Sequence, residues 1–159
     1  MPIKVLFVCL GNICRSPTAH AVFEKKVDTK GLSRHIVVDS AGTGSWHIGS
    51  SPDKRTCHTA AKYGYVMDHL AARQVSVNDF DSFDYIFAMD KSNLSDLQIL
   101  CPDNYKGTLA LFLPFCGATL MEEVPDPYYG GDDGFEHVLG LIAEASEGLL
   151  ADVRERLGA

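Results

Sequence analysis

The chain has 159 residues, of which 46% are hydrophobic and 22% charged, and its formal net charge is −7. This length is sufficient for one domain with its own core, and the composition is that of an ordinary globular protein. The negative charge argues against nucleic acid as a partner, because the phosphate backbone would be repelled, so a bound anion needs a local concentration of positive potential.

Four apolar runs predict β-strands at residues 3–9, 36–40, 85–89 and 108–113. Helical patterns occupy residues 17–27, 53–63, 91–100 and 135–157. We expect Ser16 to cap the first helix and Pro17 to be its first residue. This alternation predicts an α/β fold with one domain over residues 1–159, in which a four-stranded parallel sheet carries helices on both faces in a Rossmann-like arrangement.

The first strand leads into residues 9–16, CLGNICRS, at the sheet edge where ligands of parallel sheets bind. Backbone N–H groups that curl around a helix start bind anions, and the helix dipole strengthens such a site. We expect Gly11 and Asn12 to supply the left-handed backbone of the curl, and Arg15 to present a planar fork to two phosphate oxygens. These positive surroundings also favour a thiolate, so Cys9 is the predicted nucleophile of a phosphoryl transfer.

A cysteine followed five residues later by an arginine is a weak pattern by itself, since a chain with five cysteines can contain one by chance. The alternative interpretation treats Cys9 and Cys14 as small buried residues and Arg15 as a surface cation. The position of the pattern between a buried strand and a capped helix favours the reactive interpretation. A Walker loop is excluded, because no Gly-Lys-Ser/Thr follows Gly11.

Hydrolysis of a phosphate monoester also needs a proton donor for the leaving oxygen. The stretch VPDPYYGG, residues 124–131, places Asp126 between two prolines in a segment too constrained for a helix. We expect it to hold the Asp126 carboxyl over the anion-binding loop, with Tyr128 and Tyr129 as flat walls for an aromatic substrate. The alternative is a surface turn in which Asp126 is only solvated or caps the local backbone.

An odd number of cysteines, five, without a secretory leader pattern indicates free thiols in the cytoplasm. Neither CxxC nor HExxH spacing occurs, so we expect no metal and no cofactor. No apolar segment has the length needed to cross a membrane, so we expect no membrane partner. We interpret Cys57, Cys101 and Cys116 as structural or incidental, and we expect five histidines at the surface: His20, His35, His47, His58 and His137.

Together these motifs resemble the low-molecular-weight protein tyrosine phosphatase family over nearly the whole chain. VCLGNICRSP is similar to the phosphate loop of that family, and VPDPYYGG to its acid loop. DSAGT at residues 39–43 and AMD at residues 88–90 are similar to its second-strand turn and third-strand end. The resemblance implies a phosphotyrosine phosphatase I-like fold and metal-independent hydrolysis of phosphotyrosine and small aryl phosphates through a phosphocysteine.

The resemblance also implies roles for the chemical groups. Cys9 would be the nucleophile, and Arg15 would clamp the equatorial phosphate oxygens. Asp126 would protonate the departing phenol and then deprotonate the attacking water, and Ser16 would donate a hydrogen bond to the Cys9 sulfur. Residues implied to bind phosphate or support the loop are Leu10, Gly11, Asn12, Ile13, Cys14, Ser16, Ser40 and His69. Among these, Asn12, Ser40 and His69 would brace the loop.

For the substrate cleft the resemblance implies walls from Leu10, Ile13, Trp46 and Tyr128, with Tyr129 in a supporting position. Trp46 lies in the Gly/Ser-rich stretch GTGSWHIG and is expected to be exposed for binding. Cys14 corresponds to the family's second loop cysteine, which suggests a reversible disulfide with Cys9 under peroxide.

Two alternatives remain open at this point. A thiol-linked arsenate reductase shares this fold and loop, but it needs a downstream cysteine pair, and residues 80–93 contain none. A non-catalytic phosphotyrosine-binding module would lack a nucleophile or an acid, and Cys9 and Asp126 are both present. The expected partners are phosphotyrosine-containing proteins, with inorganic phosphate or similar oxyanions as product or inhibitor, and the expected state is a monomer.

Overall fold

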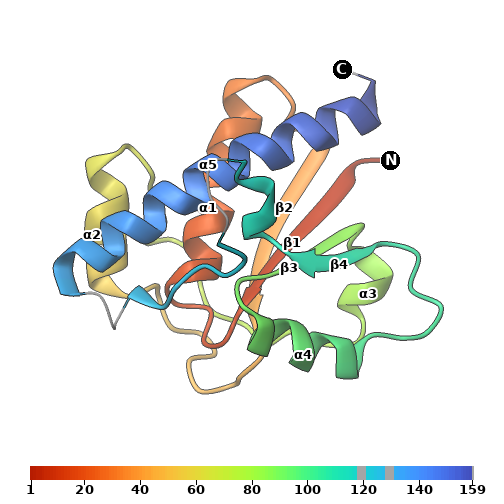
Figure 1. The fold of residues 1–159 in the computed structure, drawn as a ribbon, viewed down its shortest axis with the longest axis horizontal. Helices are drawn as coiled ribbons and strands as arrows, with labels where there is room; N and C mark the ends of the chain where they lie inside the picture. Colours follow the sequence, from red (N-terminus) through yellow and green to blue (C-terminus); the bar gives the residue numbers. More distant parts are fainter. Residues whose placement is uncertain (118–120, 128–130, 159) are drawn as a thin grey trace.

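A four-stranded parallel sheet forms the centre of the computed structural model, which describes residues 1–117, 121–127 and 131–158 (Figure 1). The strands are β1 (Ile3–Cys9), β2 (Ile36–Gly42), β3 (Tyr85–Ala88) and β4 (Thr108–Leu111), and they lie in the order β2-β1-β3-β4. Six of the seven residues of β1 are buried, as expected for a central strand that is covered on both faces. The predicted parallel α/β sheet is therefore confirmed.

Helices cover both faces of this sheet, as predicted (Figure 1). The elements between and after the strands are α1 (Arg15–Thr29), α2 (Lys54–Lys62), α3 (Asp79–Ser82), α4 (Lys91–Leu100), η1 (Leu113–Phe115) and α5 (Gly131–Leu157). Apolar residues of α1 and α5 pack with Phe7 and Phe87 on one face. Residues of α3 and α4 pack with Leu6 and Ile86 on the other face. The alternation of side chains along each strand produces these two separate cores.

Most element boundaries agree with the sequence patterns, and the differences have local causes. β2 continues to Gly42 because it pairs with β1 as far as Cys9. β4 ends at Leu111, and Leu113 begins η1 instead of continuing the strand. The short helix α3 was not predicted, since four residues are too few to show a helical period.

The prediction that Ser16 caps the first helix is wrong. α1 begins at Arg15, the cap position is Cys14, and no side chain caps this end. The Ser16 hydroxyl instead contacts groups of the preceding loop, where it lies 3.0 Å from the Cys9 sulfur. The prediction that Pro17 is the first residue of α1 is also wrong, because it is the third; it still falls within the first turn, where its missing N–H costs no helical hydrogen bond.

The carboxyl ends of three strands meet at one edge of the sheet. Cys9 is paired with Gly42, and Val8 is paired with Ala88. The segments that follow β1, β2 and β3 therefore leave the sheet side by side, and this convergence builds the site described below. Within the described residues, no helix combines the length and the apolar character that spanning a bilayer requires.

Candidate active site

The loop of residues 9–16 connects β1 to α1 and is held by the chain that follows β2. The carbonyl oxygens of Cys9, Leu10 and Ile13 accept hydrogen bonds from the N–H groups of Thr43 (2.9 Å), Gly44 (2.9 Å) and Asp53 (2.8 Å). These bonds engage the loop carbonyls, and the Asn12 N–H donates to the Cys9 sulfur (3.3 Å), so the arrangement is compatible with an anion-binding nest.

Close packing behind the loop depends on Gly42, because a Cβ at this position would lie 2.7 Å from the Leu10 carbonyl oxygen. Gly42 thus lets the end of β2 approach the loop backbone directly.

Asn12 provides the left-handed turn of the loop, with a φ of 57°. Gly11 has no positive φ, so the expectation that both residues share this role is correct for Asn12 only. The side chain of Asn12 stabilises the turn at both ends, since Nδ2 donates to Ser16 Oγ (2.8 Å) and Oδ1 accepts from the Arg73 N–H (3.0 Å). An asparagine is well suited here, because its short amide can bond locally while its backbone is left-handed.

The Arg73 backbone that holds Asn12 is itself anchored by an ion cluster. The guanidinium of Arg73 bonds both carboxylate oxygens of Asp79 (3.1 Å each) and also contacts Asp39 Oδ2 (3.0 Å). Burial works against the charge of Arg73, but the hydrogen bond to Asp79 and the field of Asp39 outweigh it, so the pKa of the guanidinium is raised. Sequence reasoning missed this support, because Arg73 is distant from the loop along the chain.

The Cys9 sulfur lies at the bottom of the loop, in a residue that is only 3% exposed. It accepts a hydrogen bond from the Asn12 N–H (3.3 Å) and lies 3.0 Å from Ser16 Oγ. Ser16 Oγ in turn lies 3.3 Å from the Ala41 carbonyl oxygen, which fixes the hydroxyl next to the sulfur. Donors of this kind stabilise negative charge on sulfur, both in an attacking thiolate and in a departing one.

Arg15 is oriented by contacts on one side of its guanidinium. Nη1 donates to Asp90 Oδ2 (2.7 Å) and to the Val124 carbonyl oxygen (3.1 Å), and the Arg15 side chain is 8% exposed. Nε and Nη2 make no hydrogen bond to the residues that the structure describes, so an edge of the fork remains available for an oxyanion. Asp90 was not predicted as a site residue; its position after the third strand, in AMD, was the available signal.

Asp126 reaches the same hollow from the segment of residues 121–127. This segment is docked on the sheet edge through Val124, which is fully buried and whose N–H donates to the Met89 carbonyl oxygen (2.8 Å). The hollow, which we call the bowl, measures about 140 Å³ and is lined by residues from three segments: Cys9, Leu10, Gly11, Ile13, Cys14, Arg15, Trp46, His47 and Asp126. The structure thus brings together the three residues expected to carry the chemistry.

The rim of the bowl includes Trp46, which is 72% exposed, as expected for a binding residue. Its ring lies against Gly44, where a Cβ would overlap the indole. His47 also lines the bowl and is exposed. Tyr128 and Tyr129 lie outside the described residues, so their predicted positions are not addressed by the structure.

Ser40 and His69, which were expected to brace the loop together with Asn12, make no hydrogen bond to Asn12 among the described residues. Ser40 is buried and its Oγ bonds His20 Nδ1 (3.0 Å), whereas His69 is exposed and has no hydrogen bond to Asn12 or Ser40 among the described residues. The expected surface position of His20 is therefore wrong: it is 8% exposed, with Nε2 facing Glu24 at 3.5 Å. The hydrogen bond from His20 lowers the pKa of Glu24.

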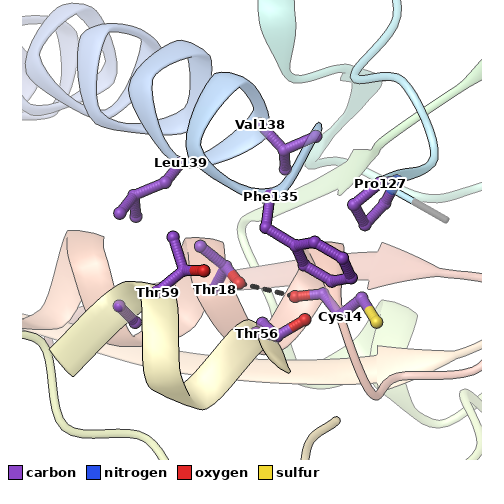
Figure 2. A pocket seen from close by; sticks show the side chains of 9 residues that line it. Cys14, Thr18, Thr56, Thr59, Pro127, Phe135, Val138 and Leu139 are labelled. Atoms are coloured by element: carbon purple, nitrogen blue, oxygen red, sulfur yellow. Dashed lines mark hydrogen bonds between the residues drawn. The ribbon is translucent and has the colours of Figure 1, made fainter. Parts of the chain in front are cut away.

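Cys14 belongs to the wall between the bowl and a small internal cavity of about 10 Å³. Figure 2 shows this cavity, where Cys14 of the loop end, Pro127 and Phe135 of α5 gather above Thr56 of α2. Thr18 Oγ1 donates to the Cys14 carbonyl oxygen (2.6 Å) and ties the loop end to the first turn of α1. The end of the loop, α2, α5 and the segment of residues 121–127 therefore meet around this cavity.

All five cysteines are free thiols in this structure. Cys9, Cys14 and Cys116 are buried, and burial raises the pKa of Cys57 and of Cys101. Cys116 Sγ lies 3.0 Å from Glu144 Oε2 of α5 and does not line the bowl. No group of three or more histidine, cysteine or acidic side chains is arranged to hold a metal ion in the described part of the chain.

Comparison with known proteins gives a consistent result. Residues 4–158 match the family model described as "Low molecular weight phosphotyrosine protein phosphatase". A protein of that name from Schizosaccharomyces pombe is 45% identical over 152 residues, covering 95% of this chain and 97% of the relative. A low molecular weight protein-tyrosine-phosphatase from Streptomyces coelicolor is 45% identical over 162 residues, covering 99% and 97%.

Solved structures agree with these relatives. The crystal structure of a protein tyrosine phosphatase from Entamoeba histolytica, with Hepes in its active site, superposes with a TM-score of 0.92 at 44% identity. The alignment covers 96% of this chain and 97% of that one. The structure of YfkJ from Bacillus subtilis gives a TM-score of 0.91 at 43% identity, with 98% and 97% covered.

Proposed function

The chain belongs to the low molecular weight phosphotyrosine protein phosphatase family and is a protein tyrosine phosphatase, and we propose that Cys9, Arg15 and Asp126 perform its reaction. One observation supports these roles above all others. The three side chains line a single bowl at the sheet edge, where the Asn12 N–H donates to the Cys9 sulfur and the Ser16 hydroxyl lies 3.0 Å from it.

In the first step the Cys9 thiolate attacks the phosphorus of an aryl phosphate. A sulfur–phosphorus bond forms, the bond from phosphorus to the phenolic oxygen breaks, and protonated Asp126 gives its proton to the leaving oxygen. The free edge of Arg15 and the loop N–H groups bind the equatorial oxygens, which carry the charge of the transition state. Asp90 and the Val124 carbonyl oxygen orient Arg15 for this contact.

In the second step water attacks the phosphocysteine. The Asp126 carboxylate now accepts a proton from the water, the sulfur–phosphorus bond breaks, and Cys9 leaves as a thiolate with inorganic phosphate as product. Ser16 Oγ at 3.0 Å and the Asn12 N–H at 3.3 Å stabilise the departing sulfur. Inorganic phosphate and related oxyanions are therefore expected to inhibit by occupying the bowl.

The physiological substrates we propose are phosphotyrosine-containing proteins. Trp46 and Leu10 are exposed apolar residues at the rim, and they suit contact with a phenyl ring entering the bowl. The roles of Tyr128 and Tyr129 as further walls remain part of this proposal.

The test is hydrolysis of para-nitrophenyl phosphate in the presence of EDTA. We expect turnover that survives chelation, is abolished by Cys9→Ser and falls with Asp126→Ala, and a requirement for metal would contradict the assignment. The loss caused by Asp126→Ala should grow as the leaving phenol becomes more basic, because such phenols need more protonation. An equal loss across a series of phenols would remove Asp126 from the acid role.

We further propose that Cys14 protects Cys9 from irreversible oxidation. Peroxide would oxidise the Cys9 thiolate to a sulfenic acid, and the Cys14 thiol would then displace water to form a disulfide. Both cysteines line the bowl, which supports this pairing. Peptide mass spectrometry of the oxidised, inactive enzyme should detect a Cys9–Cys14 linkage that thiols reverse; oxidised enzyme that lacks this linkage and is not revived by thiols would refute it.

A reducing cytoplasm and a monomeric state complete the proposal. The nucleophile is a thiol that must remain reduced, which fits that compartment. Gel filtration combined with light scattering at several concentrations tests the monomer, and a mass near 35 kDa, about twice the 17.3 kDa of the chain, would contradict it.

A further inference from the structure

A second hollow adjoins the bowl and is not used by the proposed reaction. It measures about 320 Å³ and lies between the start of α4, at residues 90–93, and the segment of residues 123–126. It shares Leu10, Arg15 and Asp126 with the bowl, so the two are continuous at the catalytic centre. We call it the side groove. A peptide whose phosphotyrosine enters the bowl would place a neighbouring residue at the side groove.

The side groove carries the carboxylate of Glu123, which lies within the field of the Lys91 ammonium but is not directly paired with it. Asp90 also faces it, but its carboxylate is paired with Arg15 at 2.7 Å. The Glu123 carboxylate accepts only the backbone N–H of Lys91 (2.8 Å) and has no ion-pair partner among the described residues. The ammonium group of Lys91 is bonded to the neighbouring Glu122 (2.9 Å). Asp126 adds a second carboxyl at the boundary with the bowl.

An unsatisfied acceptor lies in the same wall. Asn93 lines the side groove and is 2% exposed, and its Oδ1 has no hydrogen-bond partner in the described part of the chain. A buried amide oxygen without a donor is costly, and such groups normally have a partner. The oxygen is itself inaccessible, so Asn93 contributes a polar wall to the groove and is not a direct contact for a ligand.

From these observations we propose that the side groove binds the lysine or arginine side chain of a residue next to phosphotyrosine in the substrate. The proposal rests on the proposed function and adds a preference among phosphotyrosine sites. The basic group is attracted by Glu123, and its aliphatic stem lies along Pro125, which is partly exposed in the groove. Arg15 contributes its charge to Asp90 and to phosphate, so it does not cancel the attraction of Glu123.

The test compares synthetic phosphotyrosine peptides that differ in one residue. Four positions are varied one at a time, namely the two residues before and the two residues after phosphotyrosine. Each carries lysine, norleucine or glutamate in turn, all other positions are alanine, and kcat/KM is measured for every peptide. For the native chain, lysine should be preferred over norleucine by about two- to fivefold at one position, the effect expected of a largely exposed ion pair. Glutamate should be disfavoured at the same position. Equal values for lysine and norleucine at all positions would overturn the proposal.

Two variants with the same charge change separate the side groove from the general field of the protein. Glu123→Gln keeps an oxygen acceptor for the Lys91 N–H and should abolish the lysine-to-norleucine ratio. Glu155→Gln is the control, because Glu155 is exposed on α5 and lines neither hollow, and it should keep the ratio. An equal loss in both variants would refute a specific subsite. Absence of hydrolysis of every phosphate ester would instead refute the proposed function, so the two failures are distinguishable.

Discussion

Substitution of Asp90 by asparagine tests whether the orientation of Arg15 controls the reaction. Asp90 has two tasks, since Oδ2 pairs with Arg15 Nη1 at 2.7 Å and Oδ1 caps α4 by accepting the Asn93 N–H at 2.7 Å. Asparagine has one carbonyl oxygen, which can continue to cap the helix, and an NH2 group that would face the guanidinium. The variant therefore removes the ion pair and leaves the cap.

The magnitude follows from the environment of this pair. The Arg15 and Asp90 side chains are 8% and 22% exposed, so solvent screens their interaction only in part. A hydrogen bond to a charged group contributes about 1.5–3 kcal/mol, which corresponds to a rate loss of about 10- to 150-fold if the contact is needed in the transition state. We expect kcat/KM for an aryl phosphate to fall within this range, and the inhibition constant of inorganic phosphate to rise with it.

The matched control is Asp53→Asn, which changes the same residue type at the cap of α2. Asp53 Oδ1 accepts from the N–H groups of Arg55 (2.9 Å) and Thr56 (3.3 Å), so asparagine preserves both contacts. Loss of kcat/KM in this control should stay below about twofold, as for other near-neutral cap exchanges. If Asp90→Asn loses no more activity than the control while both variants melt at similar temperatures, Asp90 does not orient Arg15 and the reasoning fails.

Three further predictions concern other contacts. Ser16→Ala should slow hydrolysis of the phosphocysteine by about tenfold or more, because one donor to the departing sulfur is lost. Stopped-flow assays should then show a burst of phenol equal to the enzyme concentration, and a linear time course would contradict this prediction. Arg73→Met should reduce the free energy of unfolding by about 1–2 kcal/mol, since Asp39 and Asp79 lose their partner in a partly exposed cluster, and Arg73→Lys should cause a smaller loss. Equal denaturant midpoints for the native chain and both variants would exclude the cluster as an anchor. Burial raises the pKa of Tyr105, so the unfolded chain ionises first and stability should fall as pH rises above about 10. Tyr105→Phe should flatten this part of the pH profile in urea unfolding, and an unchanged slope would refute the assignment.

The local chemistry of residues 9–16 could be predicted from their order in the chain. A thiol at the end of a buried strand, a residue that tolerates left-handed backbone and an arginine at a helix start are local features, and each has one dominant structural consequence. The same is true of Asp126 between two prolines. These patterns were sufficient to predict the fold class, which is confirmed, and to select Cys9, Arg15 and Asp126, which line one bowl and whose catalytic roles stay a prediction.

The supports of the loop could not be predicted in this way. Asp90 holds Arg15 across 75 positions of sequence separation, and the Arg73 N–H reaches Asn12 across 61. Contacts at such distances depend on strand order and register, which leave no periodic mark in the sequence. His20 illustrates the same limit: its polar character predicted exposure, yet its position on α1 buries it against Ser40 of β2.

The sequence by itself determined which groups can do chemistry, because side-chain type and local backbone preference are properties of neighbouring residues. Only the tertiary structure decided which of them meet, since the parallel pairing of β1 with β2 and β3 brings the carboxyl ends of three strands to one edge of the sheet. It also decided that Glu123 faces a groove while Glu122 does not, a difference between adjacent identical residues that depends solely on how the segment packs against α4.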